Sequence, residues 1–142
     1  MNRIVLHFPE DEQFARKLAG ALEAVYAPLS LHRFPDAESL VRLDADVGDR
    51  TVVISSSLAR PDEKTLPLLF AADAARELGA RGVVLVAPYL AYLRQDRRFK
   101  AGEAVTSRSY ARLLSAAFDG LVTVDPHLHR YRALEEIYGI PT

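Results

Sequence analysis

The sequence GVVLVAPYLAYLRQDRRFK, residues 82–100, joins an apolar run to a dense group of positive charges. Residues 82–87 have the pattern of a buried strand, and Pro88 ends it. Four cations follow within seven residues: Arg94, Arg97, Arg98 and Lys100. Ligands of open α/β sheets bind at the carboxyl ends of strands, and guanidinium groups match the geometry of phosphate. The stretch therefore indicates a phosphate-binding segment, or equally a solvated charged loop.

Outward from this stretch, apolar runs alternate with helical patterns. Short apolar runs at residues 4–8, 50–55, 82–87 and 121–124 predict strands. Three- and four-residue spacings predict helices beginning near Asp11, Thr65 and Thr106, and a last short helix over residues 131–138. Residues 29–34 and 38–43 flank the turn formers of residues 35–37 and predict a hairpin. This order predicts a three-layer α/β/α fold with a mostly parallel sheet and a small antiparallel hairpin.

Composition narrows the class of protein. The 142 residues fit one domain, and 49% hydrophobic with 26% charged residues is typical of a globular chain. A net charge of −1 provides no general attraction for nucleic acid. The absence of cysteine excludes disulfides and thiolate chemistry and is compatible with the cytoplasm, where we expect the protein. The first apolar run is too short for a signal peptide, and no stretch approaches the roughly 20 apolar residues of a membrane span.

Two further groups of residues could carry chemistry. Phe34, Asp36 and Glu38 combine an aromatic ring with acceptors, which can stack on a base and accept from its amine, although hairpin turns often contain Asp. His127 and His129 follow a predicted strand and could be metal ligands, phosphate partners or surface residues. Asp125 beside them favours a metal somewhat, because Mg²⁺ prefers carboxylate and phosphate oxygen.

Several catalytic patterns are missing from the sequence. It contains neither the G-x-x-x-x-G-K-[ST] loop nor the G-x-G-x-x-G fingerprint, and it presents no nucleophile–base pair. We therefore expect any nucleotide to be held by cations and strand ends.

Four motifs together resemble the ribose-phosphate pyrophosphokinase family. Residues 88–98 resemble its signature P-Y-x-x-Y-x-R-Q-D-[RK]-[RK], and residues 34–38 resemble its F-x-D-G-E element. Residues 124–127 resemble V-D-x-H, and residues 104–108 resemble the P-I-S-A-[KR] start of the helix after a mobile loop. Their order and separations agree along essentially the whole chain.

The resemblance implies a phosphoribosyltransferase-like fold and a specific reaction. Members transfer diphosphate from ATP to the 1-hydroxyl of ribose 5-phosphate with Mg²⁺ as cofactor, giving phosphoribosyl pyrophosphate and AMP. The resemblance implies that the 34–38 element, through Phe34, Asp36, Ala37 and Glu38, holds the adenine of an ATP bound mainly by a neighbouring subunit. It also implies that Arg94 and Gln95 contact ATP, and that His127 with Asp125 serves the Mg²⁺ site. A homo-oligomer, dimer to hexamer, is the expected assembly.

The chain departs from the family pattern at three points. Ala37 replaces the usual glycine, and Gly139 stands where many members have an acidic residue. The acidic loop for ribose 5-phosphate and the catalytic Lys/Arg loop of a second domain are absent. We therefore expect residues 1–142 to be an amino-terminal domain without catalytic residues of its own, inactive alone and weak in ATP affinity.

Two other functions remain open. A non-catalytic regulatory partner of a full-length synthetase would have the same motifs. A nucleic-acid-binding module would use residues 94–112, where six basic and two acidic residues give a net charge of +4. That patch is modest and has only Phe99 and Tyr110 as stacking rings, so we expect no nucleic-acid partner.

Overall fold

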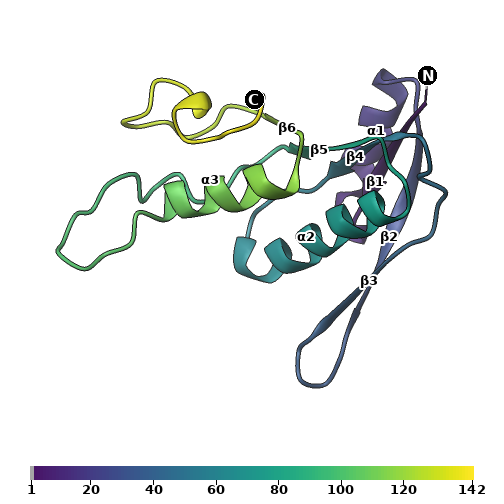
Figure 1. Cartoon of the computed structure of the whole chain (residues 1–142), viewed down its shortest axis with the longest axis horizontal. Coiled ribbons are helices and arrows are strands. Elements are labelled where there is room, and N and C mark those ends of the chain that lie inside the picture. Colours follow the sequence, from purple (N-terminus) through teal and green to yellow (C-terminus); the bar gives the residue numbers. More distant parts are fainter. Residues whose placement is uncertain (1) are drawn as a thin grey trace.

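A six-stranded sheet organises the chain, of which the computed structural model describes residues 2–142 (Figure 1). The strand order is β3-β2-β1-β4-β5-β6, and every neighbouring pair is parallel except β2 with β3. The strands are β1 (Arg3–His7), β2 (Val25–Arg33), β3 (Ser39–Leu43), β4 (Thr51–Ser55), β5 (Gly82–Ala87) and β6 (Gly120–Thr123). The mostly parallel sheet and its antiparallel hairpin are therefore confirmed.

Three helices cover the two faces of this sheet. They are α1 (Glu12–Ala21), α2 (Pro61–Glu77) and α3 (Thr106–Ala117), with short 3₁₀ turns η1 (Pro9–Asp11) and η2 (Leu134–Glu136). Val5 and Val53 pack with Ala15 and Ala19 of α1 in one cluster. The alternate strand residues face the other way and form the larger core with α2 and α3; they include Ile4, Leu6, Ile54 and Leu85. This alternation produces the three predicted layers.

Two predicted helices differ from the structure. The helix expected near Thr65 begins at Pro61, so Pro67 lies in its interior instead of its first turn. The helix expected over residues 131–138 is only the three-residue turn η2. Ala133 is extended there, with φ −152° and ψ 158°, and the chain instead buries Leu134 and Tyr138 against the core.

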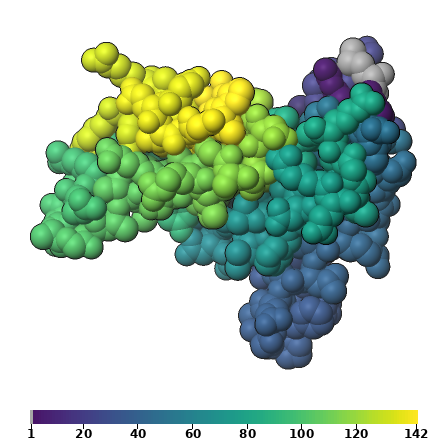
Figure 2. Space-filling model, in the orientation of Figure 1, coloured from purple at the N-terminus to yellow at the C-terminus, as the bar shows by residue number. Residues whose placement is uncertain are grey.

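The carboxyl ends of β4, β5 and β6 meet at one edge of the sheet, since these strands are parallel neighbours. The loop after β5 and the segment after β6 extend to the same side of the molecule (Figure 1). The β2–β3 hairpin projects elsewhere, as the dark blue lobe at the bottom of Figure 2. Within residues 2–142, no helix is both long enough and apolar enough to cross a bilayer.

Candidate functional site

The segments after β4, β5 and β6 enclose a recess of about 930 Å³. This volume lies at the upper end of the range of small-molecule sites. Residues 59–63 at the start of α2 form one wall, and residues 89–95 form another. Asp125 and His127 complete the lining after β6. The structure thus brings together four residues that the sequence predicted for the site: Arg94, Gln95, Asp125 and His127.

Arg94 and His127 also line a second recess of about 420 Å³ beside the first. Its other lining residues are Phe99, His129 and Arg130, so no carboxylate lines it. The rings of His127 and His129 meet edge to face, with centroids 4.1 Å apart. The first recess, which we call the mixed recess because acidic, basic and apolar side chains line it, therefore shares Arg94 and His127 with the recess lined by basic side chains. This arrangement can accept a ligand with a polar body and an anionic tail.

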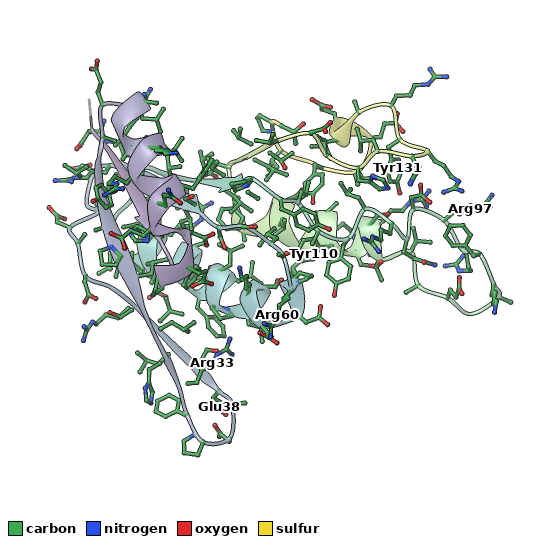
Figure 3. All side chains as sticks on the ribbon, turned by 180° about the vertical axis from the view of Figure 1, so that it is seen from behind. Arg33, Glu38, Arg60, Arg97, Tyr110 and Tyr131 are labelled. Atoms are coloured by element: carbon green, nitrogen blue, oxygen red, sulfur yellow. The ribbon has the colours of Figure 1, made fainter. Side chains whose placement is uncertain are left out.

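The loops after β5 and β6 are fixed to each other by Asp96. Its side chain is fully buried, and its Oδ1 accepts a hydrogen bond of 2.7 Å from Nη1 of Arg130. The hydroxyl of Tyr131 donates to the backbone carbonyl of Asp96 and also lies 2.9 Å from the hydroxyl of Ser107. Tyr131 and Arg97 lie near each other in Figure 3, at the end of the molecule that carries both loops. The recess walls therefore share a common brace.

Gln95 lines the recess, but its amide nitrogen is engaged within the loop. Nε2 donates to the carbonyl of Arg97 at 3.2 Å and to Oε2 of Glu103 at 3.0 Å. Glu103 also accepts from backbone N–H groups, and the hydrogen bond from Lys100 is the largest of the effects that lower its pKa. This role of Glu103 could not be predicted from the sequence, because it depends on the backbone path of the loop and not on a motif.

The recess also contains residues that the sequence analysis did not select. Arg60 and Tyr92 both have positive φ, 59° and 58°, and line the recess together with Asp62. The hydroxyl of Tyr92 donates to the Asp62 carboxylate, and this hydrogen bond raises the pKa of the phenol. Residues 59–62 follow β4, so their place at the carboxyl end of a predicted strand was the available signal for them.

The predicted adenine-binding element lies at the tip of the β2–β3 hairpin and does not line the recess. None of Phe34, Asp36, Ala37 and Glu38 lines the recess, and Figure 3 shows Glu38 far from Arg97. The tip is closed by a hydrogen bond of 2.9 Å from Phe34 N to the carbonyl of Glu38, and Asp36 Oδ1 accepts from Glu38 N at 3.1 Å. Phe34 is 41% exposed. Within one chain, the two parts of the predicted ATP site are separate.

Asp125 and His127 lie on the same lining, and no third metal ligand joins them in the part of the chain that the structure describes. No group of three or more His, Cys, Asp or Glu side chains suited to a metal occurs among residues 2–142. The carboxylate of Asp125 is the type of ligand that Mg²⁺ prefers, and Mg²⁺ commonly binds one or two carboxylates together with substrate phosphates and water. The residues therefore fit a magnesium ion carried by a phosphate ligand better than a metal held by protein alone.

Comparison with known proteins identifies the family of the chain. A family model described as the N-terminal domain of ribose phosphate pyrophosphokinase matches residues 4–117. The ribose-phosphate pyrophosphokinase of Methanopyrus kandleri is 46% identical over 125 residues, which cover 87% of this chain and 43% of that protein. The ribose-phosphate pyrophosphokinase of Methanothermobacter thermautotrophicus is 36% identical over 131 residues, which cover 92% of this chain and 45% of that protein.

A solved structure has the same fold. Phosphoribosylpyrophosphate synthetase from Mycobacterium smegmatis superposes with a TM-score of 0.82 at 24% identity, covering 99% of this chain and 47% of that one. The chain thus spans less than half the length of these relatives. By the family match and these identities, the chain belongs to the family defined by the N-terminal domain of ribose phosphate pyrophosphokinase.

Proposed function

We propose that the chain forms the ATP-binding part of a ribose-phosphate pyrophosphokinase, which transfers diphosphate from ATP to ribose 5-phosphate in the cytoplasm. The observation that carries this proposal is the shared position of Arg94 and His127 between the mixed recess and the recess lined by basic side chains. The names of the relatives support the reaction. ATP has the required chemistry, because a polar base and ribose precede a chain of phosphates.

In this proposal each residue of the recess has a distinct task. The guanidinium of Arg94 binds and orients the polyphosphate, which is most of what a protein does in phosphoryl-type transfer. Gln95 adds an amide donor, and His127 would contact a phosphate oxygen or a water bound to the metal. Asp125 would supply a carboxylate ligand to a bound Mg²⁺, and that ion would neutralise charge on the polyphosphate.

The hairpin tip of a second copy completes the adenine end of the site. Phe34 stacks on the base, Asp36 and Glu38 accept from its amine, and Ala37 shapes the turn that presents them. Two observations support this assignment to a neighbour: the tip is exposed, and it does not line the recess of its own chain. The active form is accordingly a homo-oligomer, between a dimer and a hexamer.

Ribose 5-phosphate binds mainly to the part of the relatives that this chain does not cover. We expect the 142-residue chain to make no phosphoribosyl pyrophosphate when it is incubated with Mg²⁺, ATP and ribose 5-phosphate. Detectable product from the purified chain would show that it contains the whole active site. The alternative, a regulatory partner, requires that the chain change the rate of an added full-length synthetase.

Mixing two variants tests the shared site. Phe34→Ala removes the contribution of the hairpin, and Arg94→Ala removes that of the recess. Each variant alone lacks one wall at every site, whereas an equimolar mixture forms some hybrid sites with both walls intact. We expect the mixture to bind ATP more tightly than either variant alone.

The matched control mixes Phe34→Ala with the double variant Phe34→Ala/Arg94→Ala, which has no intact hairpin to contribute. If the affinity for ATP recovers in the first mixture and not in the second, the result supports a site shared between copies. Wild-type affinity in Phe34→Ala alone, or equal binding by both mixtures, would overturn it.

A further inference from the structure

One oxygen of Glu103 collects three hydrogen bonds inside the loop between β5 and α3. Oε2 accepts from Nε2 of Gln95, from the backbone N of Phe99 and from the backbone N of Lys100, each at 3.0 Å. Successive backbone N–H groups that converge on one point form a nest, a common anion-binding concavity. In this loop the nest consists of the Phe99 and Lys100 N–H groups and the Gln95 amide, and the carboxylate of Glu103 occupies it.

The surroundings of the nest carry excess positive charge. Arg98 Nε donates to the backbone carbonyl of Glu103 at 2.7 Å, which leaves the guanidinium charge without a carboxylate partner among residues 2–142. The guanidinium carbons of Arg97 and Arg130 lie 4.8 and 5.2 Å from the ring centroid of Phe99. Phe99 in turn lines the 420 Å³ recess together with Arg94 and both histidines. The four cations of residues 94–100 thus outnumber the two carboxylates of the loop, Asp96 and Glu103, and Asp96 is already paired with Arg130.

We propose that this nest is a binding site for a phosphate group and that Glu103 is its displaceable internal occupant. The proposal rests on the proposed function, because it takes the polyphosphate of ATP as the natural ligand. A phosphate oxygen accepts the same N–H donors as a carboxylate oxygen and attracts the flanking cations with greater charge. Displacement of Glu103 frees the amide of Gln95, which then donates to the phosphate. Glu103 is on this account a positioning residue, since it sets when the donors are available.

A purely structural brace gives the opposite expectation. If Glu103 only holds the loop together, removing its carboxylate disorganises the donors and weakens phosphate binding. If Glu103 competes with phosphate, removing it raises the fraction of chains whose nest is open, and apparent affinity rises in proportion. Whether the affinity for phosphate rises or falls when the Glu103 carboxylate is removed therefore distinguishes competition from a purely structural role.

The test is a titration of the 142-residue chain with inorganic pyrophosphate, followed by amide NMR. Glu103→Ala empties the nest, and Glu103→Gln keeps the shape while removing the charge. Glu77→Ala is the matched control, because it removes an equal charge from an exposed position at the end of α2. We expect Glu103→Ala to bind pyrophosphate roughly tenfold more tightly than wild type and Glu103→Gln to gain less. The amide signals of Phe99 and Lys100 should move on titration, and Glu77→Ala should behave as wild type.

Two results would overturn the proposal. One is that both Glu103 variants bind pyrophosphate no more tightly than wild type. The other is that the Phe99 and Lys100 amides stay fixed while other signals move.

A parallel titration with Mg²⁺ and ATP, read at the amides of Arg94 and His127, separates this inference from the proposed function. If those amides respond while the nest does not, the ATP site stands and the nest assignment fails. If the Phe99 and Lys100 amides respond to pyrophosphate while the Arg94 and His127 amides do not respond to Mg²⁺ and ATP, the nest assignment is supported and the ATP assignment fails.

Discussion

The guanidinium of Arg33 donates a hydrogen bond of 2.7 Å to the backbone carbonyl of Glu63. That carbonyl is the acceptor that residue 67 would use in a regular helix, and Pro67 has no N–H to donate. The other Nη of Arg33 donates to the hydroxyl of Ser39 across the hairpin, also at 2.7 Å. Arg33 therefore fastens the tip end of the β2–β3 hairpin to the first turn of α2, the turn that lines the recess (Figure 3).

We expect Arg33→Ala to lower the free energy of unfolding by about 1 kcal/mol, because it leaves the Glu63 carbonyl without its partner. The loss should shrink in the Pro67→Ala background, since alanine at this position restores the N–H that bonds the carbonyl. A double-mutant cycle from urea unfolding of the four proteins measures this coupling. Equal losses with proline and with alanine at position 67 would show that Arg33 does not compensate for the proline.

The Asp96–Arg130 ion pair should be the costliest contact to remove from the loops. Arg130→Ala leaves the buried carboxylate of Asp96 without its cation. We expect a loss of about 1–3 kcal/mol in unfolding free energy, less than for a fully buried pair, because Arg130 is partly exposed. Arg132→Ala is the control, since that side chain is exposed two residues along the same segment. Equal free energies of unfolding for the two variants would show that the Asp96–Arg130 ion pair does not stabilise the loops.

Ala37 holds a backbone conformation that favours glycine. Its φ is 71°, in the left-handed region, where a Cβ costs roughly 1–2 kcal/mol. Glycine removes this strain but adds freedom to the unfolded chain, so Ala37→Gly should stabilise the protein by a net of about 0.5–1 kcal/mol. Ala101→Gly, at an exposed turn residue without positive φ, should give no gain. If thermal unfolding shows that Ala37→Gly is no more stable than wild type, the turn is not strained.

Tyr110 should make stability depend on pH in the alkaline range. Burial raises the pKa of its phenol to about 12, and its hydroxyl lies 3.0 Å from that of Thr65. The unfolded phenol ionises near pH 10, so the unfolded state loses its proton first. The contribution of Tyr110 to the free energy of unfolding is therefore complete below about pH 10 and is lost as the pH rises toward 12.

Comparison with Tyr110→Phe isolates this effect. At pH 8 the free energy of unfolding of wild type should exceed that of the variant by about 1 kcal/mol, because of the hydrogen bond with Thr65. This difference should fall above about pH 10. Urea unfolding at a series of pH values measures it. A difference that stays constant up to about pH 12 would contradict the raised pKa.

The sequence predicted the features that local pattern controls. Residues 50–55 and 82–87 have continuous apolar centres rich in β-branched residues, and both became inner strands of the sheet. Because parallel strands end at one edge, Arg94 and His127 could be expected to converge, and both line the recess. The turn formers at residues 35–37 likewise marked the hairpin.

Features that depend on distant partners could not be predicted in this way. The start of α2 was misplaced because proline is normally tolerated only in the first turn, and the residue that accommodates Pro67 is Arg33, far earlier in the chain. The segment 131–138 has a helical spacing, yet burying Leu134 and Tyr138 against the core favoured an irregular path. The role of Glu103 follows from two backbone N–H directions that no spacing encodes.

Arg94 is the residue that we propose binds the polyphosphate of ATP, and the affinity of three proteins for ATP with Mg²⁺ tests this role. The proteins are wild type, Arg94→Ala and the control Arg112→Ala, which removes an equal charge from an exposed position on α3. An NMR titration suits the weak binding expected here. We expect Arg94→Ala to weaken binding at least about tenfold, the value of a charge-assisted hydrogen bond, while Arg112→Ala matches wild type. Equal affinities of Arg94→Ala and wild type would show that Arg94 does not bind the polyphosphate.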